Sequence, residues 1–139
     1  MPPAAYNFAS AHWHYDFGDP RAPHDAWVEE TIIREPYSGE RKEHRSLEII
    51  VRLLGAYHDG HIELNYSAVQ NYSLVGGEQI GSGHGDWLYD EVRLSDRGYV
   101  LHEIEWSSGS RWLIECGDIS YKWTPLDALE GGSKSLVAT

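Results

Sequence analysis

Hydrophobic and polar residues alternate along most of this chain with a period of two. In the stretch LEIIVRL, Leu47, Ile49, Val51 and Leu53 all project to the same side of an extended backbone. Side chains of a β-strand point alternately to opposite faces, so the pattern predicts a strand with one buried face. Alternation or a high content of β-branched residues predicts further strands at 26–35, 62–68, 87–94, 99–106, 111–116 and 119–123.

Short glycine-containing segments separate these strands and predict hairpins. The segments YHDGH (57–61), SDRG (95–98) and SSGS (107–110) each stand between two alternating runs. Gly117 separates two runs whose hydrophobic residues alternate in phase. A glycine at such a position predicts a bulge or a corner in the strand. Residues 76–86, GGEQIGSGHGD, contain five glycines and predict a loop.

About seven strands with short connections predict an all-β, antiparallel domain, because parallel folds need longer crossover segments. The length of 139 residues corresponds to a single domain. We expect residues 1–10 to form a loose leader, residues 11–125 the β domain and residues 126–139 a C-terminal tail. A small closed barrel and a two-sheet sandwich both fit this pattern.

Charge narrows the classes of partner. The chain has 22 acidic and 11 basic residues, a formal net charge of −11. Nucleic acids and anionic membranes both require clustered Lys and Arg, so neither is expected as a partner. A basic protein would be attracted to such a chain, although acidity can also serve only to keep a protein in solution.

Other features point to a cytoplasmic protein. The only cysteine, Cys116, cannot form an intramolecular disulfide, and its position within an apolar strand face predicts a buried, unreactive thiol. The first residues, MPPAAYNFASAHW, do not have the pattern of a secretory signal, and no apolar run approaches 18 residues.

The stretch AHWHYDFGDPRAPHD contains three histidines and three aspartates and raises the question of a metal site. On a strand, His12 and His14 would share a face and could bind one ion. A third ligand could be Asp16 on the same face, or His24 or Asp25 across a turn. The glutamate that follows such a pair in cupin-type enzymes is missing. We therefore interpret the stretch as a polar lead into the first strand and expect no cofactor. The alternative is a β-barrel that binds a small ligand, or a metal-dependent enzyme that uses His12 and His14.

The sequence contains no signature of catalysis. The motifs GxSxG, SxxK and HExxH are absent, and the glycine-rich loop lacks the Lys of a phosphate-binding P-loop. His102 falls on the apolar face of its strand, between Val100 and Ile104, which is typical of a hydrogen-bonded core histidine. We expect no catalytic residues.

One hairpin combines acidic and aromatic residues. Residues 86–105 hold six acidic and two basic side chains, a local charge of −4. Acidic residues paired across a hairpin repel one another, and a basic partner would offset that cost. We predict a partner-binding surface made of Asp86, Trp87, Tyr89, Asp90, Glu91, Glu103 and Glu105. A second candidate comprises Asp16, Asp19, Asp25 and Trp27, and a merely solvated edge is the alternative.

These features together resemble a class of bacterial proteins. The segment HDAW, the strand pair EIIVRLL and HIELNYSAV, and the later DWLYDEVRL and LHEIEWSSGSRWLIECGDISY are similar in style to small acidic immunity proteins of polymorphic toxin systems. The resemblance covers about residues 24–123 and carries no motif, so no residue role is transferred. It implies an inhibitor that binds and neutralises a cognate toxin domain, often a basic nuclease. Self-association through an edge strand, as in a homodimer, is a further possibility.

Overall fold

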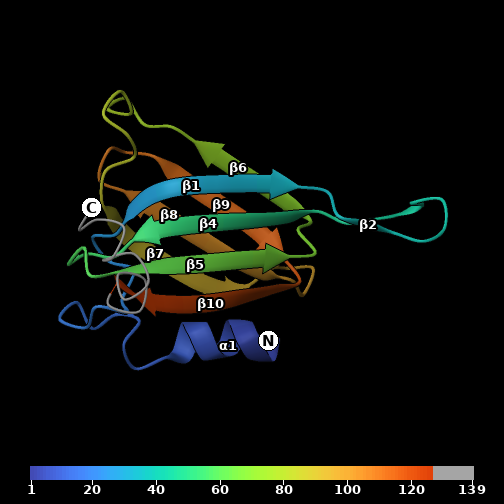
Figure 1. Cartoon of the computed structure of the whole chain (residues 1–139), viewed down its shortest axis with the longest axis horizontal. Coiled ribbons are helices and arrows are strands. Elements are labelled where there is room, and N and C mark those ends of the chain that lie inside the picture. Colours follow the sequence, from blue (N-terminus) through green and yellow to red (C-terminus); the bar gives the residue numbers. More distant parts are fainter. Residues whose placement is uncertain (127–139) are drawn as a thin grey trace, which may run out of the picture.

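Two antiparallel four-stranded sheets form the body of the protein in the computed structural model, which describes residues 1–126 (Figure 1). In spatial order the first sheet contains β1 (Trp27–Arg34), β4 (Glu48–Leu54), β5 (Gly60–Ser67) and β10 (Asp118–Pro125). The second sheet contains β6 (Asn71–Val75), β9 (Arg111–Cys116), β8 (Val100–Trp106) and β7 (Trp87–Leu94). The prediction of an all-β antiparallel domain is confirmed. Within residues 1–126 no strand pairs with both sheets, so the architecture is a sandwich.

The seven strands predicted from the sequence correspond to β1, β4, β5, β7, β8, β9 and β10. The three predicted hairpins join β4 to β5, β7 to β8 and β8 to β9. Two features of the β structure were not predicted. One is β6, and the other is a hairpin arm of β2 (Tyr37–Ser38) and β3 (His44–Arg45), which projects from the body between β1 and β4 (Figure 1).

The core lies between the inner faces of the two sheets, and the alternating residues of the sequence form it. The first sheet contributes Ile49, Val51, Leu53, Ile62, Leu64, Tyr66 and Ile119. The second contributes Trp87, Val100, Ile104, Trp106, Trp112, Ile114 and Cys116. Burial raises the pKa of the Cys116 thiol to about 12, which agrees with the expected unreactive cysteine.

Gly117 marks the point where the chain leaves one sheet for the other, as its position in the sequence predicts. Its N–H donates to the carbonyl oxygens of Ser67 and Ala68, at 2.9 and 3.0 Å. A Cβ at this position would stand 2.9 Å from the Ala68 Cβ, so a side chain would disturb this close approach.

The expectation of a loose leader at residues 1–10 is wrong, because residues Pro3–Ser10 form helix α1. Ala5 and Phe8 are buried on its inner side, and the Ala5 N–H donates to the Asp118 carboxylate at 2.8 Å. The helix has only eight residues, too few for a clear helical period in the sequence. No helix within residues 1–126 is long and apolar enough to cross a membrane.

Of the predicted C-terminal tail, only Leu126 is described. Its N–H donates to the Asp59 carbonyl oxygen at 2.8 Å. Residues 127–139 lie outside the described part of the chain.

Replacement of a central core residue tests this architecture. Leu64→Ala removes a fully buried side chain from β5, and we expect the free energy of unfolding to fall by about 2–5 kcal/mol. Leu94→Ala is the matched control, because Leu94 is 49% exposed and its loss should change stability by less than about 0.5 kcal/mol. Urea denaturation of both variants measures the difference, and equal losses would contradict the assigned core.

Candidate functional site

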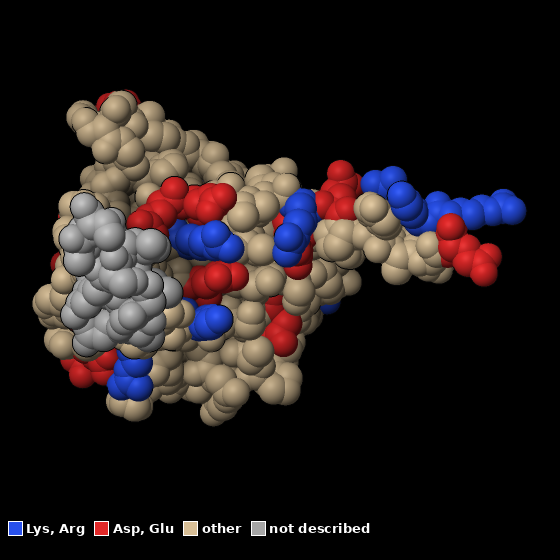
Figure 2. Space-filling view, in the orientation of Figure 1, with Lys and Arg blue, Asp and Glu red and all other residues tan. Residues whose placement is uncertain are grey.

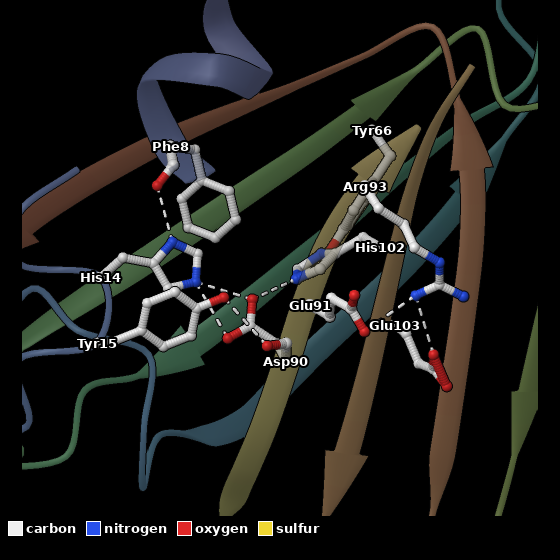
Figure 3. Close-up of polar contacts among 9 residues, drawn as sticks. All are labelled: Phe8, His14, Tyr15, Tyr66, Asp90, Glu91, Arg93, His102 and Glu103. Atoms are coloured by element: carbon white, nitrogen blue, oxygen red, sulfur yellow. Dashed lines mark hydrogen bonds and ion pairs between the residues drawn. The ribbon is translucent and has the colours of Figure 1, made fainter. Parts of the chain in front are cut away.

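A buried polar cluster joins the N-terminal segment to the sandwich. His14 lies in a turn after α1, and its ring points inward toward β7 (Figure 3). Its Nδ1 is 2.8 Å from the Phe8 carbonyl oxygen, and its Nε2 is 2.8 and 3.0 Å from the two carboxylate oxygens of Asp90. Both acceptors lie outside the turn itself, so the contacts fix the orientation of the turn.

Asp90 extends the cluster across the second sheet and into the first. Its Oδ2 also accepts from Nε2 of His102 on the neighbouring β8, at 2.8 Å. The other ring nitrogen of His102 is 2.8 Å from the hydroxyl of Tyr66, which comes from β5 of the opposite sheet (Figure 3). The expectation that His102 is a hydrogen-bonded core histidine is confirmed. A chain of side-chain hydrogen bonds thus crosses the core.

The partners decide where the protons lie. Both ring nitrogens of His14 face oxygen acceptors, so both carry a proton and the ring is positively charged. His102 donates to Asp90 and accepts from the Tyr66 hydroxyl, which is the pattern of a neutral imidazole. The cluster therefore contains one positive and one negative charge, with every polar atom paired.

The surroundings of Asp90 and Tyr66 are consistent with this assignment. Burial alone would raise the pKa of Asp90, but the hydrogen bonds from His102 and His14 outweigh it and hold the pKa well below its usual value. Burial raises the pKa of Tyr66, which keeps the hydroxyl protonated and able to donate to His102.

The cluster is not placed for catalysis. None of its four side chains is more than 3% exposed, and the adjacent hollow has a volume of about 30 Å³, enough for about one water molecule. A reactant could not reach the Asp90 carboxylate or either imidazole. The cluster instead fixes the N-terminal segment against the strands.

The structure does not assemble the hypothesised pair of metal ligands. Both ring nitrogens of His14 are engaged, and the exposed His12 points to Arg21, with 3.4 Å between His12 Nε2 and Arg21 Nη2. Within residues 1–126 no group of three or more His, Cys, Asp and Glu side chains is arranged to hold a metal ion.

The predicted binding residues divide between the core and the surface. Trp87 and Asp90 are 1% and 3% exposed, so they cannot contact a partner and that part of the prediction is corrected. Asp90 is in phase with Val92 along β7, so its side chain faces inward. Tyr89 and Glu91 are exposed, and Asp86, Glu103 and Glu105 are half-buried.

Basic side chains neutralise most of the glutamates of the predicted binding surface. Arg93 Nη1 lies 3.1 Å from Glu103 and 3.4 Å from Glu91 (Figure 3), and Arg111 Nη2 lies 2.7 Å from Glu105. Arg111 belongs to β9, which pairs with β8. The sum of charges over residues 86–105 therefore did not include it. The three glutamates therefore do not form a surface of concentrated negative charge.

The outer face of the first sheet carries both signs of charge (Figure 2). Glu30, Arg52, Glu63 and Lys122 stand in one row across its four strands. Opposite charges at adjacent cross-strand positions compensate one another, so this face does not attract a partner of one sign.

Exposed aromatic and apolar side chains gather elsewhere, at one end of β7. Tyr15, Phe17, Leu88 and Tyr89 surround the small hollow beside the buried cluster, and each is between 51% and 54% exposed. The Tyr15 hydroxyl donates to the Asp90 carbonyl oxygen at 3.1 Å, which attaches this ring to the strand. Exposed groups of this kind mark interaction sites more often than single exposed residues do.

The two candidate segments of the sequence meet at this place. The Asp25 N–H donates to the Trp87 carbonyl oxygen at 2.8 Å, and the Trp87 N–H donates to the Ala26 carbonyl oxygen at 3.0 Å. The Trp27 indole N–H donates to the Asp86 carboxylate at 2.6 Å. We name this surface the aromatic–acidic face, comprising Tyr15, Asp16, Phe17, Asp25, Trp27, Asp86, Leu88 and Tyr89.

Within residues 1–126 the carboxylates of the aromatic–acidic face have no Lys or Arg beside them, and His24 Nε2 lies 3.4 Å from Asp25. Among residues 1–126, no Lys or Arg forms an ion pair with Asp16, Asp25 or Asp86. Asp19, which the sequence placed in the same group, differs because Arg21 binds it at 2.7 Å. The side-chain hydrogen bond from Arg21 lowers the pKa of Asp19 to about 2.

Comparison of the chain with protein-family models, with curated proteins and with solved structures finds no match in any of the three.

Removal of the buried charge tests the role of the cluster. Asp90→Asn leaves the charged His14 without its counter-ion, and we expect the free energy of unfolding to fall by about 3–5 kcal/mol. Glu103→Gln breaks a partly exposed ion pair on the same sheet and should cost less than about 1 kcal/mol. Chemical denaturation at pH 7 compares the two, and a loss for Asp90→Asn as small as that of the control would contradict the assignment.

Acidification should remove the contribution of the Asp90 carboxylate to the free energy of unfolding. The pKa of Asp90 is depressed in the folded protein relative to about 3.9 when unfolded, so its stabilisation is present above that value and declines as pH falls. The stability difference between the wild type and Asp90→Asn should therefore narrow between about pH 5 and pH 2. Denaturation curves across this range measure it, and a constant difference would show that Asp90 does not titrate as described.

Proposed function

We propose that this protein binds a basic protein partner through the aromatic–acidic face and acts as an immunity-type inhibitor of a bacterial toxin domain. The observation that carries the proposal is the exposed group of Tyr15, Phe17, Leu88 and Tyr89, bordered by carboxylates that no Lys or Arg of residues 1–126 pairs with. Apolar area and negative charge are presented together, on residues from two distant parts of the chain.

The chemistry of this face suits a protein rather than a small molecule. The hollow among Tyr15, Phe17, Leu88 and Tyr89, about 30 Å³, is too small for a substrate, whereas the aromatic side chains around it offer contact area with few rotatable bonds. A hollow of about 300 Å³ lies at the edge of the face, beside Trp27 and Asp86. Tyr and Trp are also over-represented among the residues that contribute most to binding energy. Asp16, Asp25 and Asp86, with the net charge of −11, would speed the approach of a basic partner.

The face is held rigid before any partner arrives. Tyr15 is bonded to β7, Phe17 stacks on His24 with 3.8 Å between ring centroids, and the Tyr57 hydroxyl donates to the Phe17 carbonyl oxygen at 2.9 Å. A surface that is already ordered loses less conformational entropy on binding, which favours tight association.

Inhibition of a toxin is the more specific part of the proposal. It is supported by the resemblance in style to acidic immunity proteins and by a binding face that needs no chemistry of its own. Such an inhibitor would act in the cytoplasm, where it would cover the active site of its cognate toxin, with a basic nuclease as the expected class.

Affinity capture with matched variants tests the binding face. Tagged wild type, Tyr89→Ala and Tyr6→Ala would be used to capture proteins from the native cells at about 50 mM and about 500 mM salt. Tyr6 is an exposed tyrosine on α1, outside the face, and serves as the control. We expect one stoichiometric basic partner that is retained by wild type and Tyr6→Ala, and bound at least about tenfold more weakly by Tyr89→Ala and at high salt.

Toxicity assays then test the inhibitor proposal separately. The captured partner would be expressed in a heterologous host with each of the three proteins. Growth restored by wild type and Tyr6→Ala, but not by Tyr89→Ala, would support neutralisation through this face. A harmless partner would refute the toxin proposal, and equal capture by all three proteins would refute the assigned face.

A further inference from the structure

The two sides of the sandwich differ in how their edge strands are covered. One side, formed by β10 and β7, carries the N-terminal residues 1–26, with α1 lying along β10 (Figure 1). The other side is formed by β1 and β6, and neither strand has a further strand beside it in the described part of the chain. An unpaired edge presents N–H and C=O groups to any strand that approaches.

The covered side shows how this protein protects an edge. On β7 the Leu88 carbonyl oxygen lies 3.2 Å from Nδ1 of His24, and the Asp90 carbonyl oxygen accepts from Tyr15. Side chains of the N-terminal segment thus form hydrogen bonds with outward-facing carbonyl oxygens of β7. No backbone hydrogen bond from within residues 1–126 reaches β1 from any strand but β4, and no side chain bonds to its backbone.

Exposure of inward-facing side chains also distinguishes β1. Ile33 is paired with Ile49 of β4, and the two side chains share the inner face of the sheet. Ile49 is fully buried, whereas Ile33 is 44% exposed at the edge of the sheet. An irregularity between Val28 and Glu30 ends the regular register, so the strand is regular from Glu30 to Arg34.

The charges of this regular stretch are self-complementary. If two copies of β1 run antiparallel with Ile32 opposite Ile32, then Glu30 of each copy stands opposite Arg34 of the other. Thr31 then stands opposite Ile33 of the second copy, on the inner face. The twofold symmetry makes both contacts twice, as in any isologous dimer. A shift of one residue would separate Glu30 from Arg34 and place side chains on the wrong faces.

We propose that β1 is a homodimerisation edge, which pairs antiparallel with β1 of a second copy and joins the two first sheets into one. The side chains of Glu30 and Arg34 are 51% and 57% exposed. Each is paired on its inner side with a residue of β4, Arg52 and Glu48 respectively, and a second copy would place an opposite charge on its outer side. Their opposite signs favour this one partner, since a strand with another charge order would meet like charges. The proposal does not depend on the function of the aromatic–acidic face.

Charge reversal with mixing tests this register. In Glu30→Arg the residues at positions 30 and 34 are both positive, and in Arg34→Glu they are both negative. Like charges then face each other across the interface, so each variant alone should dimerise about tenfold more weakly than wild type. The two variants mixed together restore both opposite-charge contacts in a heterodimer. Sedimentation equilibrium from about 5 to about 500 µM would measure the dissociation constant of each protein and of the mixture.

Glu63→Arg is the matched control, because it makes the same charge change on the same outer face but on β5, away from the edge. It should dimerise as wild type. Mixed with Arg34→Glu it should not form heterodimers as strong as those of Glu30→Arg with Arg34→Glu, because its Glu30 would face the new Glu at position 34. Thermal unfolding checks that each variant is folded, since the surface ion pairs to Arg52 and Glu48 are each worth less than about 1 kcal/mol. A wild type that stays monomeric at about 500 µM would overturn the proposal, as would dimerisation that the single reversals leave unchanged.

Discussion

The placement of one carboxylate governs much of this structure. Asp90 lies in the core, where an isolated negative charge would be very unfavourable, and it is stable there because His14 and His102 both donate to it. His102 is supplied by the neighbouring strand, but His14 must be brought from the N-terminal segment. The requirement to pair the charge of Asp90 therefore fixes where residues 11–15 lie and, with them, how one side of the sandwich closes.

The same requirement connects the interior to the surface. Once His14 is fixed, its neighbour Tyr15 stands against the backbone of β7 and the chain continues past Phe17 to pair with Trp87. The exposed aromatic group is thus built on a buried ion pair. A polar core of this kind costs desolvation energy, and in this protein it gives the aromatic–acidic face a single defined geometry.

Much of the fold could be predicted from the sequence, because alternation in strands such as LEIIVRL directly reflects one buried and one solvated face. The corner at Gly117 and the core role of His102 were also predicted. Helix α1 was missed because eight residues show little periodicity, and β6 because NYSLV at an open edge is mostly exposed and lacks a clean alternation.

The candidate site was predicted only in part, since charge counted along the chain ignores which side of a strand a residue faces. Asp90 is in phase with the apolar Val92, and that phase was the available signal that it points inward. Arg111 neutralises Glu105 from a strand that a hairpin-based count leaves out. The meeting of segments 16–27 and 86–89 is a tertiary contact, which no local pattern encodes.

The docking of α1 has a consequence for the order in which the chain can fold during synthesis. Ala5 bonds to Asp118, 113 positions later, and Phe8 stacks on Tyr121 of the same strand with 5.5 Å between ring centroids. Helix α1 therefore packs against a strand that is synthesised more than 100 residues later. Until β10 has emerged, α1 lacks the strand on which it docks and the first sheet lacks an edge, so the native sandwich forms only after β10 has been translated.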